Sequence, residues 1–245
     1  MRSEKDSSSS RQPAGHLFLG TQEIHLWRAD TRDLAGCAAQ LAATLSADER
    51  ERAGSFRHRR DRERFISRRG LLRTILGRYL ARHPDQIVFR YGPFGKPLLD
   101  PVHHASPLTF NQAHSKDLIL SAVSRRRWLG VDVEAVEPID DLAGVSAQFL
   151  SRADSAVLAS LPAQERLPAF YSRWTRLEAY LKATGEGLSG SRVQIEAGLD
   201  SNGWKILAVD PAPGYLGAVA ADEGDWRVSF RDWSAGRTAL RPAPR

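Results

Sequence analysis

The stretch WLGVDVE, Trp128–Glu134, decides the fold of this chain. Hydrophobic residues at every second position alternate with a glycine and two acids: Leu129, Val131 and Val133 against Gly130, Asp132 and Glu134. This period of two predicts a β-strand with one apolar face and one face that carries both carboxylates. Two carboxylates so close together repel each other, so they either remain in water or share a cation. The stretch alone leaves a solvated edge strand and a cation site as equal alternatives.

A second stretch, Trp174–Leu188 (WTRLEAYLKATGEGL), adds a third acid and a lysine. Pro168 precedes it and Gly185 lies within it, which predicts a helix over Ala169–Thr184. One stripe of that helix, at i, i+4 and i+8, carries Trp174, Glu178 and Lys182. The alternative to a functional role is a surface ion pair between the acid and the lysine, worth about 0.3–0.5 kcal/mol.

Composition is that of a globular protein of one large or two small domains, with 245 residues, 42% hydrophobic and 26% charged. No apolar run approaches the roughly 20 residues of a membrane helix, and the first residues lack the apolar core of a signal peptide. The single cysteine, Cys37, excludes an internal disulfide and favours a cytoplasmic location. A net charge of +6 favours acidic partners such as phosphates, nucleic acid or an acidic protein.

A basic run lies between Arg57 and Arg69, where seven arginines face only Asp61 and Glu63. Hydrophobic residues recur at helical spacing from Phe65 onward until Pro84, which predicts a helix that includes the run. Such a run is usually a solvated helix face. The functional alternative is a phosphate-binding surface made by guanidinium groups and backbone N–H groups at the start of the helix.

The order of elements predicts an α+β fold. Ser46 and Glu49 form a capping box that opens a short helix, and in each half of the chain helices lead into short strands. The basic triplet Arg125–Arg127 is a plausible boundary between the halves. We therefore expect a tail at 1–22, two α+β halves at 23–127 and 128–234, and a second tail at 235–245.

Four motifs in this order resemble those of the Sfp-type 4′-phosphopantetheinyl transferases: Gly95-Lys96-Pro97, Phe110–Ser115 (FNQAHS), Gly130–Glu134 (GVDVE), and Trp174–Glu178 (WTRLE) continuing to Lys182 and Gly185–Leu188 (GEGL). The resemblance runs from about Ile24 to Trp233. It implies a pseudo-twofold pair of α+β halves with the active site between them. It also implies an enzyme that moves the phosphopantetheine arm of coenzyme A onto a serine of an acyl or peptidyl carrier protein and releases adenosine 3′,5′-bisphosphate.

On this resemblance, Asp132, Glu134 and Glu178 are the ligands of Mg²⁺, which prefers hard oxygen donors. Lys182 is similar to the family lysine that meets the pyrophosphate and assists charge or proton transfer at the attacking serine. The general base is Glu134 or Glu178, acting directly or through a water, and the sequence does not decide between them.

The resemblance also implies a coenzyme A pocket in the first half. His114 matches the histidine that contacts the 3′-phosphate, and Lys96 with Pro97 matches part of the adenine and phosphate pocket. Arg59 and Arg64 align with basic residues near the 3′-phosphate.

Two positions depart from the family pattern, because Ala113 replaces a serine and Leu177 replaces a lysine. These departures keep open a second reading, in which the chain binds coenzyme A but is catalytically impaired and serves as a scaffold. A nucleic-acid-binding module built on Arg57–Arg69 is a third reading, and the interleaved acids argue against it. The sequence leaves open which carrier protein is modified, in fatty-acid, polyketide or another pathway, while the two-halved resemblance favours a monomer.

Overall fold

The computed structural model describes residues 16–185, 203–222 and 224–234. Its helices are α1 (Thr31–Leu34), α2 (Ala38–Ala43), α3 (Ala47–Ser55), α4 (Arg59–Leu80), α5 (Leu142–Phe149), α6 (Arg152–Ser160) and α7 (Ala163–Thr184), with 3-10 turns at Ala35–Cys37 and Pro84–Gln86. Its strands are β1 (Glu23–Asp30), β2 (Phe89–Tyr91), β3 (Pro97–Leu99), β4 (Leu108–Ser115), β5 (Leu118–Arg125), β6 (Leu129–Ala135), β7 (Trp204–Val209), β8 (Tyr215–Asp222) and β9 (Arg227–Asp232).

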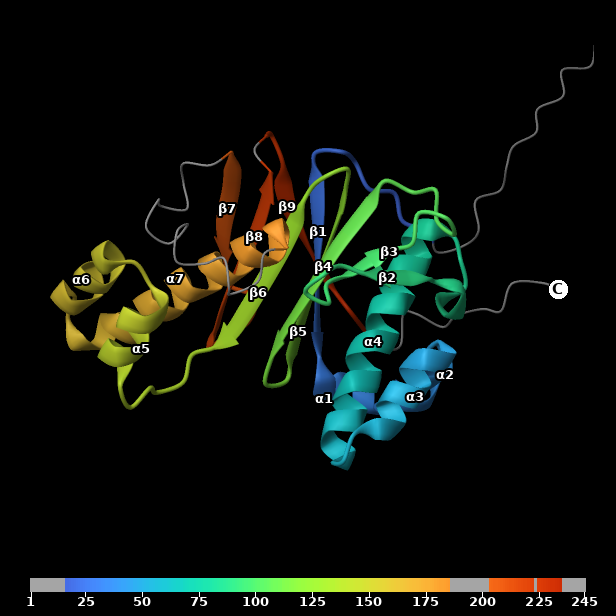
Figure 1. Ribbon diagram of the computed structural model, residues 1–245, viewed down its shortest axis with the longest axis horizontal. Helices are drawn as coiled ribbons and strands as arrows, with labels where there is room; N and C mark the ends of the chain where they lie inside the picture. The colour runs from blue at the N-terminus through green and yellow to red at the C-terminus, as the bar shows by residue number, and fades with distance from the viewer. Residues whose placement is uncertain (1–15, 186–202, 223, 235–245) are drawn as a thin grey trace, which may run out of the picture.

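The strands form two larger sheets, ordered β4-β5-β1-β9 and β6-β8-β7, and a small β2-β3 hairpin. The two larger sheets share one connectivity. In each, a first strand (β1 or β6) is followed by helices and then by an antiparallel pair (β4 and β5, or β7 and β8), and the last strand of that pair lies between the other two. Figure 1 shows the strands in the middle of the molecule, with α4 at one end and α5–α7 at the other. The predicted α+β fold of two similar halves is confirmed.

The last strand crosses the predicted boundary between the halves. β9 pairs in parallel with β1, so residues 227–232 of the expected second half lie in the first sheet. The expected tails lie outside the described residues, apart from 16–22. Among the helices of the described ranges, none is both long and apolar enough to cross a membrane.

The two sheets meet where β4 runs beside β6, and side chains join them there in place of a backbone ladder. The Val131 N–H donates to Asn111 Oδ1 at 2.9 Å, and the Ala135 N–H donates to Ser115 Oγ at 3.1 Å. Both contacts join residues 20 positions apart, so β4 and β6 run in the same direction. We call this contact the seam, defined by Asn111 and Ser115 on β4 and Val131 and Ala135 on β6.

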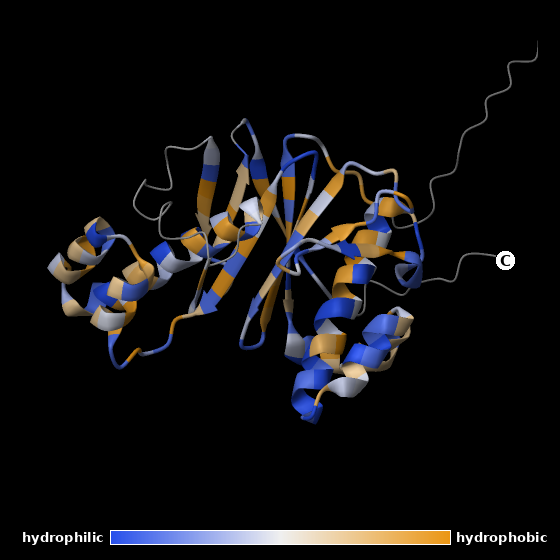
Figure 2. Cartoon of the chain, in the orientation of Figure 1, coloured by the Kyte–Doolittle hydropathy of each residue, from blue (hydrophilic) through white to orange (hydrophobic). Residues whose placement is uncertain are grey.

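Helix α4 covers the first sheet with the hydrophobic positions that the sequence identified. Leu72, Ile75, Leu76 and Tyr79 are buried in one core cluster with Trp27 of β1. Hydrophilic residues fill the first turns of α4, where the basic run lies (Figure 2). The run is therefore placed at the start of a helix whose later turns are fixed in the core.

Helix α7 begins six residues earlier than predicted, at Ala163 rather than Ala169, and Pro168 lies inside it. Pro168 is the sixth residue of the helix, so its missing N–H removes one hydrogen bond, to the carbonyl of Gln164, and the helix continues past it. The predicted end is correct, because Gly185 has φ +77° and its N–H donates to the carbonyl of Leu181 at 2.9 Å.

Helix α7 and strand β6 touch backbone to backbone at Gly130. A Cβ atom at this position would lie 1.9 Å from the Ala179 carbonyl oxygen and 2.5 Å from the Ala183 nitrogen. No side chain fits in that space, so only glycine permits the helix to approach the strand this closely.

We therefore expect Gly130→Ala to lower the free energy of unfolding by about 3 kcal/mol or more, because the backbone of α7 must move away from β6. Urea denaturation measures the change. Gly54→Ala is the matched control, since a Cβ at Gly54 in α3 meets nothing within 4 Å and alanine favours the helix. Equal stability of the two variants would contradict the contact.

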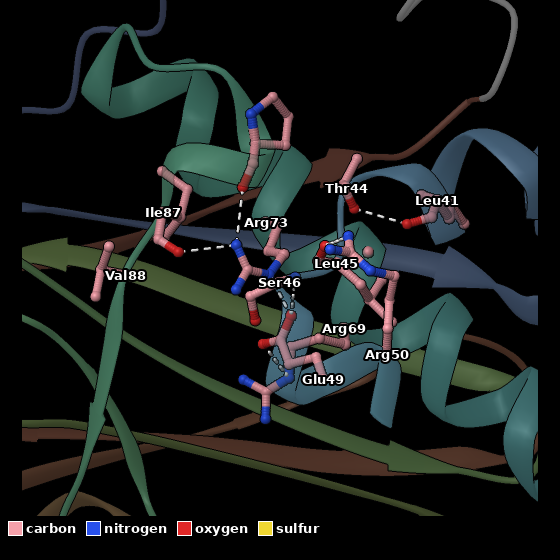
Figure 3. Close-up of polar contacts among 12 residues, drawn as sticks. Leu41, Thr44, Leu45, Ser46, Glu49, Arg50, Arg69, Arg73, Ile87 and Val88 are labelled. Atoms are coloured by element: carbon pink, nitrogen blue, oxygen red, sulfur yellow. Dashed lines mark hydrogen bonds and ion pairs between the residues drawn. The ribbon is translucent and has the colours of Figure 1, made fainter. Parts of the chain in front are cut away.

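A buried ion cluster fastens α4 to α3 (Figure 3). Glu49 is 2% exposed, and its Oε2 accepts from Arg73 Nε at 2.5 Å and from the Ser46 N–H at 3.1 Å. Arg69 Nε lies 3.3 Å from Oε1, and Arg73 Nη1 also donates to the carbonyls of Pro84 and Ile87. The predicted capping box is confirmed, and its glutamate also balances two arginines of α4.

Replacing Glu49 by glutamine leaves Arg73 buried without a carboxylate, and we expect a loss of about 3 kcal/mol in the free energy of unfolding. Chemical denaturation at neutral pH measures it. Glu51→Gln, on the exposed side of α3, is the control and should change stability by no more than about 0.5 kcal/mol. A loss as small as that of the control would show that the cluster contributes little.

Candidate active site

The two faces of β6 have the environments that the alternation predicted. Leu129, Val131 and Val133 are at most 1% exposed and belong to the core between the two sheets. Asp132 is also buried, at 3% exposure, on the side toward α7. The solvated edge strand is therefore excluded, and a buried carboxylate requires a partner.

Lys182 of α7 supplies that partner. Its Nζ donates to Asp132 Oδ1 at 2.6 Å, so the lysine bridges helix to strand, and no ion pair with Glu178 is among the described contacts. Asp132 Oδ2 is buried and has no hydrogen-bond partner among the described residues. Burial raises the pKa of Asp132 to about 7, with smaller contributions from the charges of Glu134 and Glu178, while Lys182 opposes the rise.

The other two acids complete this group. Ser115 Oγ at the seam donates to Glu134 Oε2 at 2.8 Å and so orients that carboxylate. Burial raises the pKa of Glu178, and the nearby charge of Glu134 adds to the rise. The structure thus brings Asp132, Glu134, Glu178 and Lys182 into one electrostatic group, which we call the acid site.

The donor chemistry of the acid site suits a hard divalent cation. Its carboxylates offer oxygen atoms, and Asp132 Oδ2 is a buried oxygen that lacks a donor. Over the described ranges, however, no three His, Cys, Asp or Glu side chains are gathered closely enough to hold a metal ion between them. An incomplete set of this kind matches Mg²⁺, which commonly takes one or two carboxylates and completes its shell with phosphate and water.

Two arginines and a neutral histidine lie on the other side of the seam. Arg68 Nη1 of α4 donates to His114 Nε2 of β4. Desolvation lowers the pKa of His114 to about 4, helped by the positive charges of Arg68, Lys182 and Arg64. Neither Arg64 nor Arg68 has an ion pair with another described residue. We call Arg64, Arg68 and His114 the cation site, and it adjoins the acid site because Ser115, the next residue after His114 on β4, donates to Glu134.

Sequence analysis missed Arg68 and included Arg59. Arg59 forms an exposed ion pair with Glu63 at 2.6 Å in the first turn of α4, and no described contact links it to His114. Arg64 and Arg68 are four residues apart and therefore share a face of the helix. The sequence does not show which arginine of α4 reaches His114, because this depends on how α4 packs on β4.

The Gly95-Lys96-Pro97 motif begins β3, but the side chain of Lys96 points to the second half. Lys96 Nζ donates to the carbonyls of Leu129 (3.0 Å), Lys182 and Ala183 (3.3 Å). Pro97 pairs with Tyr91 in the hairpin. The ammonium group of Lys96 is thus occupied by backbone carbonyls of β6 and α7.

Comparison with known proteins agrees with this arrangement. Residues 129–237 match the model of the 4′-phosphopantetheinyl transferase superfamily, and residues 26–126 match a 4′-phosphopantetheinyl transferase N-terminal model. The chain is 37% identical over 224 residues to 4′-phosphopantetheinyl transferase HetI of Nostoc sp., covering 88% of this chain and 94% of that protein. The chain belongs to the 4′-phosphopantetheinyl transferase family.

Two other relatives are Bacillus enzymes. The chain is 30% identical over 184 residues to 4′-phosphopantetheinyl transferase psf-1 of Bacillus pumilus, covering 75% of this chain and 76% of that protein. It is 26% identical over 194 residues to 4′-phosphopantetheinyl transferase Sfp of Bacillus subtilis, covering 74% and 84%. The predicted resemblance to the Sfp-type transferases is confirmed.

The structure explains how this family member accommodates Ala113 and Leu177. Ala113 faces the core between the sheets and is 4% exposed, with Val131 and Val133 in the same cluster. Leu177 is 3% exposed and packs with Ile206 under α7. Both positions point into apolar surroundings and away from the acid site, so the two hydrophobic residues contribute to packing.

The histidine of the cation site should titrate near pH 4. Because the folded state disfavours the imidazolium, stability falls through this group as the pH drops from 6.5 to about 4, and the loss levels off below. NMR of the ring resonance, assigned with His114→Gln, measures the pKa directly. Arg68→Met should raise it toward 6.5, and Arg62→Met, on the exposed surface of α4, should not. A wild-type value near 6.5 would contradict the geometry.

Proposed function

We propose that the protein transfers the 4′-phosphopantetheine arm of coenzyme A to a serine of an apo acyl or peptidyl carrier protein, giving the holo carrier and adenosine 3′,5′-bisphosphate. The observation that carries the proposal is the placement of a cation site beside an acid site in a chain of this family. Coenzyme A requires both, because it has a 3′-phosphate and a pyrophosphate whose P–O–P bridge is broken: one phosphorus passes with the arm to the serine oxygen, and the other stays on the leaving adenosine 3′,5′-bisphosphate. The impaired scaffold remains the alternative.

In this proposal Asp132, Glu134 and Glu178 hold Mg²⁺ through their oxygens. The bound metal would neutralise the pyrophosphate and stabilise the leaving bisphosphate. Lys182 then has two roles: its ammonium balances Asp132 through their 2.6 Å contact, and its charge, which helps to lower the pKa of His114, is a second cation for the phosphates. A lysine suits such a place because it can lose a proton, which arginine cannot.

The proton of the attacking serine hydroxyl needs an acceptor at the acid site. Glu134 and Glu178 are both candidates, acting directly or through a water. Ser115 already donates to Glu134 Oε2, which leaves its other oxygen for a proton or a cation. The raised pKa of Glu178 makes this carboxylate a stronger base than an ordinary glutamate.

The cation site is the proposed place of the 3′-phosphate. Arg64 and Arg68 repel each other without an anion and keep His114 neutral between them, and Arg68 itself has a lowered pKa because it is desolvated and next to Arg64. A phosphate dianion would relieve this repulsion and accept several N–H donors. The backbone around Lys96 and Pro97 is the proposed wall of the adenine pocket, and Arg59 is the proposed outer contact.

We further propose that the enzyme acts as a monomer in the cytoplasm and recognises acidic carrier proteins through its net charge of +6. A nucleic-acid partner is not proposed. In the Arg57–Arg69 run, Arg59 is paired with Glu63 and Arg69 lies beside the buried Glu49.

The decisive experiment incubates the purified protein with coenzyme A, Mg²⁺ and a panel of apo carrier proteins, and reads the intact mass of each carrier. We expect the mass of one phosphopantetheine group on the carrier serine, and no gain in the presence of a chelator. Asp132→Ala and Glu178→Ala should lower the rate on the order of 100-fold or more, because each removes a proposed ligand.

Glu165→Ala is the control, an exposed acid in the first turn of α7 that should leave the rate unchanged. Retained activity in either acid-site variant would contradict the proposed metal ligands. If no carrier is modified although the protein still binds coenzyme A, the result favours the impaired scaffold.

A further inference from the structure

Lys96 makes an unusual set of contacts for a surface hairpin residue. Its Nζ donates to the carbonyls of Leu129 at the start of β6 and of Lys182 and Ala183 in the last turn of α7. No described carboxylate lies within ion-pair distance of it. A single side chain of the first half thus holds two elements of the second half by their backbones.

These carbonyls need such a donor. The last four carbonyls of a helix have no intrahelical partner, and Gly185 satisfies only that of Leu181 through its N–H. The negative end of the helix dipole also lies here and attracts a cation. Contact with β6 at Gly130 keeps this end of α7 close to the strand, which restricts access of water to the carbonyls.

The shape of the donor fits a lysine in particular. Three N–H bonds that spread from one nitrogen match three carbonyls around a point, whereas the flat fork of arginine matches paired oxygens. Only 5 of the 35 Lys and Arg residues are lysines, so lysine is the less common cation of this chain. Desolvation lowers the pKa of Lys96 to about 8, the direction expected of an ammonium held by neutral dipoles.

We propose that the side chain of Lys96 is a positioning residue, which fixes the end of α7 on β6 and so sets the spacing between Lys182 and Asp132. The backbone of Lys182 is held by Lys96 while its Nζ is held by Asp132, so the two contacts orient one residue from both ends. The catalytic part of this inference rests on the proposed function, and the structural part does not. In this arrangement the backbone of Lys96 can still contact coenzyme A, while its ammonium group binds carbonyls of the protein.

Hydrogen exchange tests the structural part in the full chain without substrate. Lys96→Met keeps the length of the side chain and removes the donors, and we expect amides of the last turn of α7 and of β6 to exchange about tenfold faster or more, while those of α4 do not change. Lys96→Arg, which keeps the charge and some donors, should fall between Lys96→Met and the wild type. If Lys96→Met does not fold, the comparison of Lys96→Arg with the wild type tests the proposal.

The matched control is Lys116→Met. Lys116 also joins the two halves, through an ion pair with Glu137 at 2.7 Å, but both side chains are more than half exposed. Its removal should leave exchange in α7 unchanged. Unchanged exchange in Lys96→Met would overturn the proposal, whatever the kinetics.

Kinetics then distinguish a Lys96 that positions Lys182 for catalysis from a Lys96 that only stabilises the fold. A displaced Lys182 should lower kcat on the order of 10- to 100-fold, with the KM and calorimetric Kd for coenzyme A within about threefold of wild type. Faster exchange with an unchanged kcat would overturn the catalytic part. A Kd for coenzyme A weakened tenfold or more, with unchanged exchange, would assign the ammonium to the ligand instead. Absence of transfer by the wild type would count against the function, and exchange would still decide the role of Lys96.

Discussion

The backbone contact of α7 with β6 at Gly130 is the constraint on which the site depends. Because no side chain separates helix and strand, residues one or two positions from the contact are forced together. Asp132 lies two residues along β6, and Lys182 lies next to Ala183 on α7, so their side chains meet at 2.6 Å. The contact also buries Asp132, which raises its pKa and leaves one of its oxygens without a donor. Packing thus creates the electrostatic state of the acid site.

Opposite charges are divided between the halves of the chain. Strand β4 and helix α4 supply His114, Arg64 and Arg68, and the second half supplies the three carboxylates. Burial is the largest cause of the lowered pKa of His114 and of the raised pKa of Asp132, and the like charges of each group add to both shifts. The seam holds the two groups side by side, because backbone N–H groups of β6 donate to the side chains of Asn111 and Ser115. Charges fixed in this way need little reorganisation when a ligand of complementary charge binds.

Sequence reasoning succeeded where the determinants are local. The alternation in β6, the Ser46–Glu49 capping box and the glycine end of α7 all depend on neighbouring residues, and all agree with the structure. It did not identify contacts that depend on tertiary packing. Arg68 rather than Arg59 reaches His114 because α4 packs on β4 in one register, and the side chain of Lys96 turns to carbonyls that are distant in sequence. The predicted start of α7 was wrong because the prediction placed Pro168 before the helix, whereas Pro168 lies inside it.

The pairing of β9 with β1 has a consequence for how the protein is made. Partners such as Glu23 and Arg227 are 204 residues apart, so the first sheet acquires its outer strand only when nearly the whole chain has left the ribosome. Until then β1 presents an open edge, the kind of edge that other chains can pair with. The second sheet uses only residues between Leu129 and Asp222 and is complete earlier. The half synthesised first is therefore the half finished last, because β1 gains its second neighbour only when β9 has been made.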